Sequence, residues 1–256
     1  MILFAKYHGA GNDFIVIDDR KETFPVLDSK FIQFLCQRHI GVGADGLLLL
    51  QSSKKADARM RIFNSDGKEA AMCGNGLRCL VDFAYQLKLI GAQSTIETAD
   101  RIVECRWKEN EITVDLGPYQ WIPNELSFNA LKFHLVSTGV PHAIAFVDND
   151  DYFSLAPQIR FHPSLGQEGA NVNFAVLKEN KLHIRTYERG VEGETLACGS
   201  GAAAVAVAAQ KKYHLPNPIT IVPRSGDELK VEVLPSSLRL SGKATCVFHG
   251  SFECSI

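Results

Sequence analysis

An internal repeat constrains this chain more than any other feature of its sequence. The motif M-C-G-N-G at Met72–Gly76 returns as A-C-G-S-G at Ala197–Gly201, and an apolar tract with helical spacing follows each copy. Further segment pairs recur in the same order in both halves: 9–18 with 139–148, 44–50 with 170–177, and 95–117 with 220–242. A repeat on this scale predicts two copies of one structural unit, because each copy encodes the same elements in the same order.

Both copies have the pattern of a sheet built around a helix. Short apolar or alternating runs predict strands at 4–7, 13–18, 47–50 and 59–64, and again within 95–116 and 220–252. Helices are predicted at 28–38, N-capped by Asp28-Ser29, at 75–89, C-capped by Gly91, and at 200–211. The last helix is apolar on all sides, so other structure must enclose it. We therefore predict an α+β fold of two pseudo-symmetric domains from an internal duplication, each a curved β-sheet or barrel wrapped around a central buried α-helix.

The repeat also predicts the domain boundaries. The N-terminal half, 1–118, carries Cys73, and the C-terminal half, 119–246, carries Cys198. The remaining segment, 247–256, could pair back with the first half. With one cysteine at a helix start in each half, we expect the active site in the cleft between the two halves.

Composition excludes several classes of function. The chain has 27 Lys and Arg against 29 Asp and Glu, a net charge of −2 and no basic run, which disfavours nucleic acid as a partner. The N-terminus reads as a first strand rather than a signal peptide, and no apolar tract is long enough to span a bilayer, so we expect a cytoplasmic protein without a membrane partner. Seven cysteines at irregular spacing, without a C-x-x-C pair, predict neither a metal site nor a disulfide framework.

The two C-G-x-G motifs favour acid–base chemistry at a carbon next to a carboxylate. The first N–H groups of a helix are unpaired and carry partial positive charge, so they bind carboxylates and lower the pKa of a thiol placed there. If both motifs face one substrate, one cysteine can act as thiolate and the other as thiol on opposite faces of an α-carbon. One such motif alone is more often ordinary packing by a small buried cysteine. Two at equivalent places in a duplicated chain favour catalysis, and a redox pair would require closer spacing.

The motifs together resemble the diaminopimelate epimerase family. They are Lys6-Tyr-His-Gly-Ala-Gly-Asn-Asp-Phe14, Gly41-Val-Gly-Ala-Asp45, Asn64-Ser-Asp-Gly67, Met72-Cys-Gly-Asn-Gly-Leu-Arg-Cys79, Pro141-His142, Asn171-Val-Asn-Phe174 and Tyr187-Glu-Arg-Gly-Val-Glu-Gly-Glu-Thr-Leu-Ala-Cys-Gly-Ser-Gly201. They span nearly the whole chain in the family's order. The resemblance implies interconversion of LL- and meso-2,6-diaminopimelate for lysine and peptidoglycan synthesis, without pyridoxal phosphate, metal or other cofactor, by a homodimer.

The same resemblance implies a role for each matching residue. The acid–base pair would be Cys73 and Cys198, with Glu188 and His142 close by, tuning or positioning groups. The reacting carboxylate would bind at Gly74, Asn75, Gly199 and Ser200. Asn12 would help to position the substrate, while Asn64, Asn171 and Arg189 would bind the distal carboxylate, Arg189 through a bidentate contact. Taken singly, Asn12 and Asn64 could be turn residues, His142 a strand-end histidine, and Glu188-Arg189 a solvated ion pair.

Two positions depart from the family pattern. Val140 stands where the family usually has Asn before Pro-His, and Gly46 stands where it usually has Gln. Each replacement removes an amide that could contact the substrate, and leaving a polar group unpaired costs about 1–3 kcal/mol. We hypothesise that recognition of the distal end is relaxed and that glutamate-sized amino acids are also accepted.

Other functions remain compatible with the motifs. A proline- or hydroxyproline-racemase-like enzyme would also use two cysteines but would leave Asn64, Asn171 and Arg189 without a role. A phenazine-type isomerase would need only one acid group. A non-catalytic metabolite-binding protein would lose nothing when both cysteines are replaced.

Overall fold

The chain divides into two units. The computed structural model describes residues 1–149 and 151–253. The first unit comprises Met1–Val114 and the segment that begins at Gly242, and the second comprises Asp115–Ser241. The repeat predicts divisions after residues 118 and 246, whereas the structure divides the chain inside strands β8 (Glu111–Gly117) and β17 (Leu238–Lys243), which lead from one unit to the other.

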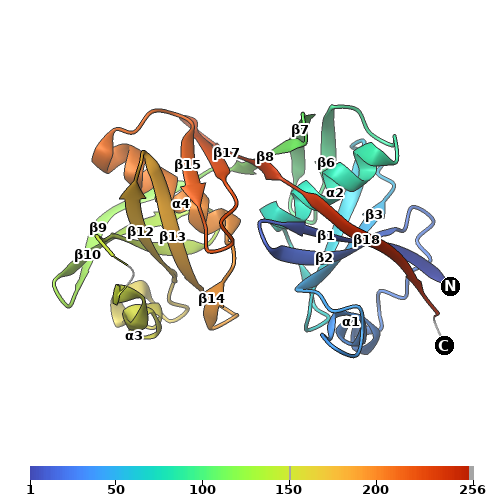
Figure 1. Cartoon of the computed structure of the whole chain (residues 1–256), viewed down its shortest axis with the longest axis horizontal. Helices are drawn as coiled ribbons and strands as arrows, with labels where there is room; N and C mark the ends of the chain where they lie inside the picture. The colour runs from blue at the N-terminus through green and yellow to red at the C-terminus, as the bar shows by residue number, and fades with distance from the viewer. Residues whose placement is uncertain (150, 254–256) are drawn as a thin grey trace. The chain divides into compact units, whose positions relative to one another are not determined.

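The first unit contains two helices and a set of mostly short strands (Figure 1). In chain order they are β1 (Ile2–Gly9), β2 (Asn12–Asp18), α1 (Ser29–Cys36), β3 (Gly46–Gln51), β4 (Ala58–Asn64), β5 (Glu69–Ala70), α2 (Gly74–Gln86), β6 (Gln93–Glu97), β7 (Ile102–Lys108), β8 and β18 (Thr245–Phe252). The C-terminal strand β18 pairs antiparallel with β1, with Ile2 opposite Phe252. Residues 254–256 of the C-terminal segment predicted to pair back lie outside the described residues.

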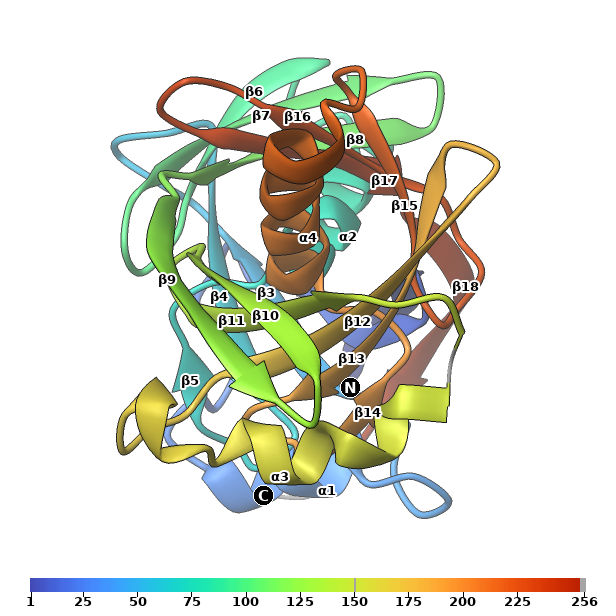
Figure 2. The same ribbon diagram turned by 90° about the vertical axis from the view of Figure 1, so that its left-hand side faces the viewer.

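The second unit repeats this order. Its elements are β9 (Gln120–Phe128), β10 (Leu131–Ser137), β11 (Pro141–Phe146), the 3-10 turn η1 (Asp151–Leu155), α3 (Ala156–Arg160), the 3-10 turn η2 (Pro163–Leu165), β12 (Asn171–Lys178), β13 (Lys181–Glu188), β14 (Gly193–Thr195), α4 (Gly199–Tyr213), β15 (Ile219–Val222), β16 (Leu229–Val233) and β17. Figure 2 shows α4 with strands of its unit curving around it.

Strand pairing establishes the duplication step by step. Strands β1 to β4 pair as antiparallel, parallel and antiparallel neighbours, and β10 to β13 pair in the same sequence. Then β4 pairs with β5 and β6 as β13 pairs with β14 and β15. The outer strands are also equivalent, because β18 pairs with β1 and β9 pairs with β10. The predicted duplicated α+β fold is confirmed.

The register of these ladders defines equivalent residues in the two units. Phe14 lies opposite Gly46 as His142 lies opposite Asn171, so Gly46 is equivalent to Asn171. The ladder positions after Phe63 and after Tyr187 make Asn64 equivalent to Glu188. Counting nine residues back from each motif cysteine would instead pair Asn64 with Arg189. That pairing is one position out of register, because the ladder pair Tyr187–Glu194 encloses one residue more than the pair Phe63–Glu69. The sequence pairing of 9–18 with 139–148 is two positions out of register, since it pairs Phe14 with Ile144 rather than with His142.

Each unit encloses one helix. Helix α2 packs against β1, β2, β3, β4, β7 and β18, and α4 packs against β10, β11, β12, β15 and β16. In α4, the run Gly201–Ala209 is completely buried. This confirms the prediction that a helix apolar on all sides lies inside the structure, since no face of it is suited to water.

Helix ends agree with the sequence less closely. Asp28 is the N-cap of α1, as predicted, and its carboxylate accepts from the N–H of Phe31 at 3.0 Å. Helix α2 does not reach Gly91. It ends at Gln86, and Lys88 adopts the left-handed conformation with φ of 59°. The N–H of Lys88 then donates to the carbonyl of Tyr85, and the next N–H donates to the carbonyl of Ala84, a Schellman ending formed without glycine.

Among the described residues, no helix is both long and apolar enough to cross a membrane. Within the same ranges, no group of three or more His, Cys, Asp or Glu side chains is arranged to hold a metal ion.

Candidate active site

Both motif cysteines occupy the same position in their units, immediately before the central helix. Cys73 is the N-cap of α2, with φ of −144° and ψ of 118°, and Cys198 is the N-cap of α4, with φ of −117° and ψ of 110°. The extended backbone at each cysteine directs the chain into the helix, so Gly74-Asn75 and Gly199-Ser200 form the first helical positions. The first N–H groups of a helix point out of its N-terminal end, which makes each helix start able to bind a carboxylate.

In the first unit, Asn12, Cys73 and Asn75 lie together. The N–H of Gly76 donates to the sulfur of Cys73 at 3.5 Å, and this thiol donates to Oδ1 of Asn12 at 3.7 Å. The same Oδ1 accepts from the side-chain amide of Asn75 at 3.3 Å, and Oδ1 of Asn75 accepts from the buried Arg78 at 3.1 Å. Asn12 is therefore held against the helix start where the thiol lies.

Two residues without an assigned role orient Asn12. Its amide donates to Asp45 at 2.8 Å, and Arg38 binds both Asp45 and Asp13, at 2.9 and 2.7 Å. Asn64, at the end of β4, is exposed and forms a turn in which its carbonyl accepts from the N–H of Gly67.

In the second unit, Ser200 lies at the helix start and contacts both Cys198 and Thr138. The hydroxyl of Ser200 lies 3.4 Å from the sulfur of Cys198, and its carbonyl accepts from the hydroxyl of Thr138 at 3.3 Å. Cys198 is buried, whereas Cys73 is partly exposed. The two cysteines therefore have equivalent backbone positions but different immediate partners.

Two of the three residues predicted to bind the distal carboxylate, Asn171 and Arg189, meet at the end of β13, whereas Asn64 lies at the end of β4 in the first unit. The backbone N–H of Arg189 donates to Oδ1 of Asn171 at 2.7 Å, and the amide of Asn171 donates to the carbonyl of Pro141 at 3.3 Å. Glu188 ends β13 opposite Gly193, adjacent to Arg189 in the chain. The structure thus brings Asn171, Glu188 and Arg189 into one corner of the second unit.

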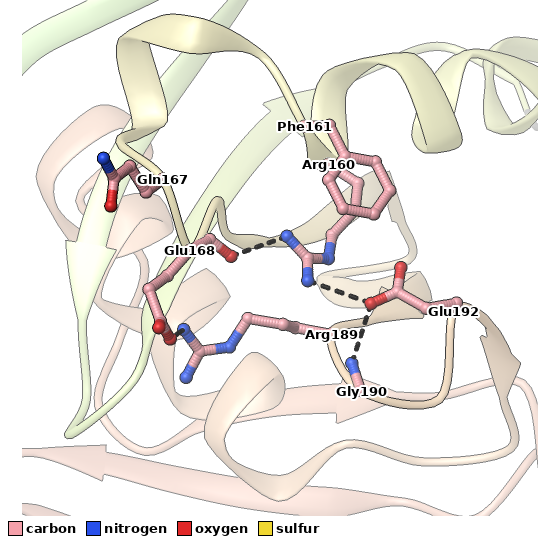
Figure 3. Close-up of a pocket in the computed structure, with 7 residues that line it drawn as sticks. All are labelled: Arg160, Phe161, Gln167, Glu168, Arg189, Gly190 and Glu192. Carbon is pink, nitrogen blue, oxygen red and sulfur yellow. Dashed lines mark hydrogen bonds and ion pairs between the residues drawn. The ribbon is translucent and has the colours of Figure 1, made fainter.

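The Arg189 guanidinium lines a depression of about 490 Å³. Figure 3 shows its two arginines, Arg160 and Arg189, each held by acidic or carbonyl groups. Arg189 donates to the carboxylate of Glu168 at 3.0 Å, and Arg160 donates to Glu192 at 2.9 Å and to the carbonyl of Glu168 at 2.7 Å. The charges of the two arginines are balanced by Glu168 and Glu192 in the same lining, and the ion pair of Arg189 with the exposed Glu168 is the one that an incoming anion can displace.

His142 is buried in the same unit, in a polar cluster. Its Nδ1 lies 3.2 Å from the side-chain nitrogen of Asn173, and Oδ1 of Asn173 accepts from the hydroxyl of Thr186 at 3.0 Å. Burial, assisted by the positive charge of Arg189, lowers the pKa of His142 from 6.5 to about 3. The imidazole is therefore neutral at neutral pH.

Sequence reasoning missed Asn173, Thr186, Arg160 and Asp45 as parts of these clusters. Asn173 carries a detectable signal, because it is a polar residue within the buried run 171–176 of strand β12. Asp45 carries one as the last residue of the motif Gly41–Asp45, whereas Arg160 belongs to none of the quoted motifs.

The sequence of the chain also matches a known protein family. A family model described as diaminopimelate epimerase matches residues 4–122 and 134–245 of the chain. The chain belongs to the diaminopimelate epimerase family. Membership of this family makes it an isomerase.

Relatives within the family align over most of the chain. A diaminopimelate epimerase of Archaeoglobus fulgidus is 40% identical over 269 residues, covering 97% of this chain and 95% of the relative. One of Flavobacterium psychrophilum is 42% identical over 207 residues, covering 79% of each.

Solved structures of low identity share the fold. A phenazine biosynthesis protein of the PhzF family from Bacillus anthracis superposes with a TM-score of 0.77 at 17% identity, covering 99% of each chain. A hydroxyproline epimerase from Agrobacterium vitis gives a TM-score of 0.70 at 14% identity, covering 97% of this chain and 91% of the other. The fold of this diaminopimelate epimerase family member therefore also occurs in a protein described as a phenazine biosynthesis protein and in one described as a hydroxyproline epimerase.

Proposed function

We propose that this protein is a cofactor-independent epimerase that interconverts LL- and meso-2,6-diaminopimelate with the thiols of Cys73 and Cys198. The observation that carries the proposal is the equivalent placement of these two cysteines, each as the N-cap of the central helix of its unit. Inversion at an α-carbon requires one group to remove the proton from one face and another to return a proton on the opposite face. A duplicated thiol meets that requirement with chemically identical groups.

The helix starts supply the electrostatic part of the reaction. As the α-proton leaves, negative charge develops on the adjacent carboxylate. Backbone N–H groups at Gly74-Asn75 and at Gly199-Ser200 stabilise that charge in the transition state more than in the ground state. The cysteine that acts as thiolate takes the proton, the other thiol donates its own, and the reverse reaction exchanges their roles.

The second-unit corner supplies distal recognition in this proposal. Arg189 and Asn171 bind the carboxylate that does not react, Asn64 assists from the first unit, and Asn12 positions the reacting end. On the family resemblance, Glu188 and His142 belong to the catalytic group of this proposal, close to the cysteines, where they tune or position groups. The depression around Arg189 supports the proposal, because the Arg189 guanidinium lines it and is held there by the exposed carboxylate of Glu168, which a substrate carboxylate can displace.

The biological context follows from the family resemblance and is part of the proposal. The product meso-diaminopimelate is a precursor of lysine and peptidoglycan. We accordingly propose a cytoplasmic homodimer.

Relaxed recognition of the distal end of the substrate is proposed from Gly46 and Val140, the two positions that depart from the family pattern. Gly46 cannot simply be given a side chain, because a Cβ at this position would lie 2.6 Å from the carbonyl oxygen of Phe63. Val140, in contrast, precedes β11 and is only partly buried, so Val140→Asn restores an amide without a backbone clash. We expect this substitution to increase kcat/KM for diaminopimelate by about tenfold, from the energy of one recovered hydrogen bond to a charged group. An unchanged value would refute the relaxed-specificity hypothesis.

α-Hydrogen exchange in D2O, followed by proton NMR, tests the function directly. Reduced protein is incubated with LL-diaminopimelate and, separately, with L-glutamate and L-proline. Loss of the diaminopimelate α-signal with appearance of the meso isomer is the expected result, and exchange of glutamate as well would support relaxed specificity. Exchange of proline alone would transfer the proposal to a proline-type racemase, and binding without exchange of any substrate would favour a metabolite-binding protein.

Single-cysteine variants test the two-base mechanism. Cys73→Ala and Cys198→Ala should each reduce inversion by about 10²–10⁴-fold, since each lacks one proton-transfer group. Each variant should retain α-hydrogen exchange with one stereoisomer, and the two variants should differ in which one. Full inversion by either variant would contradict the mechanism.

A further inference from the structure

The first turn of α2 rests on hydrocarbon. A Cβ placed on Gly76 would lie 3.2, 3.3 and 3.4 Å from side-chain carbons of three residues, Leu48, Phe14 and Ile62. We call these three residues the apolar triad. They come from β3, β2 and β4, and they pack directly beneath the helix start that carries the first cysteine.

The first turn of α4 rests on polar groups at the equivalent positions. A Cβ on Gly201 would lie 2.6 Å from Oδ1 of Asn173. The strand registers make His142 equivalent to Phe14, Asn173 to Leu48 and Thr186 to Ile62. We call His142, Asn173 and Thr186 the polar triad.

The fold itself does not require the polar triad. His142, Asn173 and Thr186 are 1%, 0% and 3% exposed, so all three polar side chains are removed from water. Burying a polar group is unfavourable unless it is fully hydrogen-bonded, whereas the apolar triad supports the same helix start in the first unit without that penalty. A role other than folding therefore accounts for the polar triad.

Hydrogen-bond directions in the polar triad determine where the imidazole proton lies. The side-chain nitrogen of Asn173 lies 3.4 Å from the carbonyl oxygen of Ala143, which only accepts, and Oδ1 accepts from Thr186. The amide nitrogen therefore faces Nδ1 of His142 at 3.2 Å as a donor. Nδ1 must accept, so the single proton of the neutral ring resides on Nε2.

Nε2 of His142 therefore carries a hydrogen that it can donate. It is buried and has no hydrogen-bond partner among the described residues. Arg189 is close enough for its charge to lower the pKa of His142, and its backbone donates to Asn171, which lies opposite His142 in the β11–β12 ladder. A buried N–H without an acceptor, near a guanidinium, is complementary to a carboxylate.

We propose that Asn173 is a positioning residue that holds His142 as the Nε2–H tautomer, and that this N–H donates to the substrate carboxylate bound by Arg189. The identity of the substrate rests on the proposed function, but the tautomer does not. His142 accordingly acts as a neutral donor in substrate binding and does not transfer the α-proton. The buried amide of Asn173 serves His142, while Thr186 keeps that amide in orientation.

Nitrogen-15 NMR of the imidazole rings tests the proposal in the intact protein. A His142→Gln variant identifies the His142 signals. Native protein should show a protonated Nε2 and an unprotonated Nδ1 between about pH 5 and 8, where an unperturbed histidine would titrate. Addition of LL-diaminopimelate should shift the Nε2 signal.

Asn173→Asp replaces the amide that donates to Nδ1 of His142 with a carboxylate, which can only accept. The proton should move to Nδ1, and KM for LL-diaminopimelate should rise about 10- to 100-fold with little change in kcat, as expected for a lost ground-state hydrogen bond to a charged group. The control Thr186→Ser keeps the hydroxyl and should leave both the tautomer and KM unchanged. If Asn173→Asp does not fold, Asn173→Leu takes its place. It carries the residue of the apolar triad, and it should release the tautomer and raise KM in the same way.

Three results would overturn the inference. The first is a proton on Nδ1 of His142 in the native protein. The second is an unchanged His142 tautomer and an unchanged KM in the Asn173 variant. The third is an Nε2 signal of His142 that does not shift when diaminopimelate binds. Failure of the proposed function gives a different pattern. The native tautomer is then as stated, but no diaminopimelate binds and none exchanges its α-hydrogen.

Discussion

A methyl group added to the third position of each central helix should be tolerated in the first unit and not in the second. Gly76 and Gly201 are equivalent and both have a helical backbone, so Gly→Ala makes the same local change in each. The new Cβ at residue 76 would meet carbons at 3.2 Å or more, at the ends of flexible side chains. The new Cβ at residue 201 would meet Oδ1 of Asn173 at 2.6 Å, and Thr186 already holds that oxygen.

The two effects can be estimated separately. Alanine is favoured over glycine in a helix by about 1 kcal/mol, which applies to both variants. At residue 76 a slight shift of the apolar side chains offsets this gain, so the free energy of unfolding should change by less than about 1 kcal/mol. At residue 201 overpacking costs about 1–3 kcal/mol, and loss of the Asn173 hydrogen bond adds about 1 kcal/mol. The Gly201→Ala variant should therefore be less stable than Gly76→Ala by about 2 kcal/mol.

Urea unfolding of both variants, followed by circular dichroism, measures the difference. The background Asn173→Ala removes the obstructing oxygen, so Gly201→Ala should destabilise this background by at least about 1 kcal/mol less than it destabilises the native protein. Equal stability of Gly76→Ala and Gly201→Ala, or no coupling between residues 201 and 173, would refute the close approach of Asn173 to α4.

Three further predictions concern ion pairs and caps. Glu168→Gln should lower KM for diaminopimelate about two- to fivefold at constant kcat, because it releases Arg189 from an exposed and therefore weak ion pair; steady-state kinetics measures this, and a raised KM would instead mean that Glu168 contacts the substrate. Asp28→Ala should reduce the free energy of unfolding by about 1 kcal/mol through loss of the bond to the Phe31 N–H, and urea unfolding should show no comparable loss for Asp28→Asn. Burial of Asp13 tends to raise its pKa, but hydrogen bonds from Arg38 and Lys6 together outweigh burial and lower it. The stabilising contribution of the Asp13 carboxylate is therefore present above about pH 4 and is lost as pH falls. Asp13→Asn should accordingly be less stable than the native protein at pH 7 and should approach it at pH 3, as measured by thermal unfolding; a constant difference would contradict the assignment.

Local patterns explain why much of the fold was predictable. The N-cap Asp28, the helix that follows Cys73 and the enclosed helix Gly199–Tyr213 all follow from residues within one or two turns of one another. The ending of α2 was not predictable in this way, because Lys88 adopts a left-handed conformation that its residue type does not favour. Packing around the end of the helix overrides that preference.

The residues of the candidate site also differ in whether local sequence patterns predict them. The cysteines, the helix-start glycines and the Asn171–Arg189 region are marked by short motifs whose spacing survives in the sequence. The equivalence of Asn64 with Glu188 is not marked, because it depends on the register of strands that are distant in the chain, and a turn longer by one residue changes it.

The sequence by itself therefore determined the duplication, the order of elements and the position of one cysteine before each central helix, because these are encoded in local periodicity and capping residues. Only the tertiary structure decided what supports each helix start. Three hydrocarbon side chains do so beneath Gly76, and the Asn173 amide, which is hydrogen-bonded to the His142 imidazole, does so beneath Gly201. The physical reason is that hydrogen bonds between buried side chains are made across strands, where separation along the chain carries no information about distance in space.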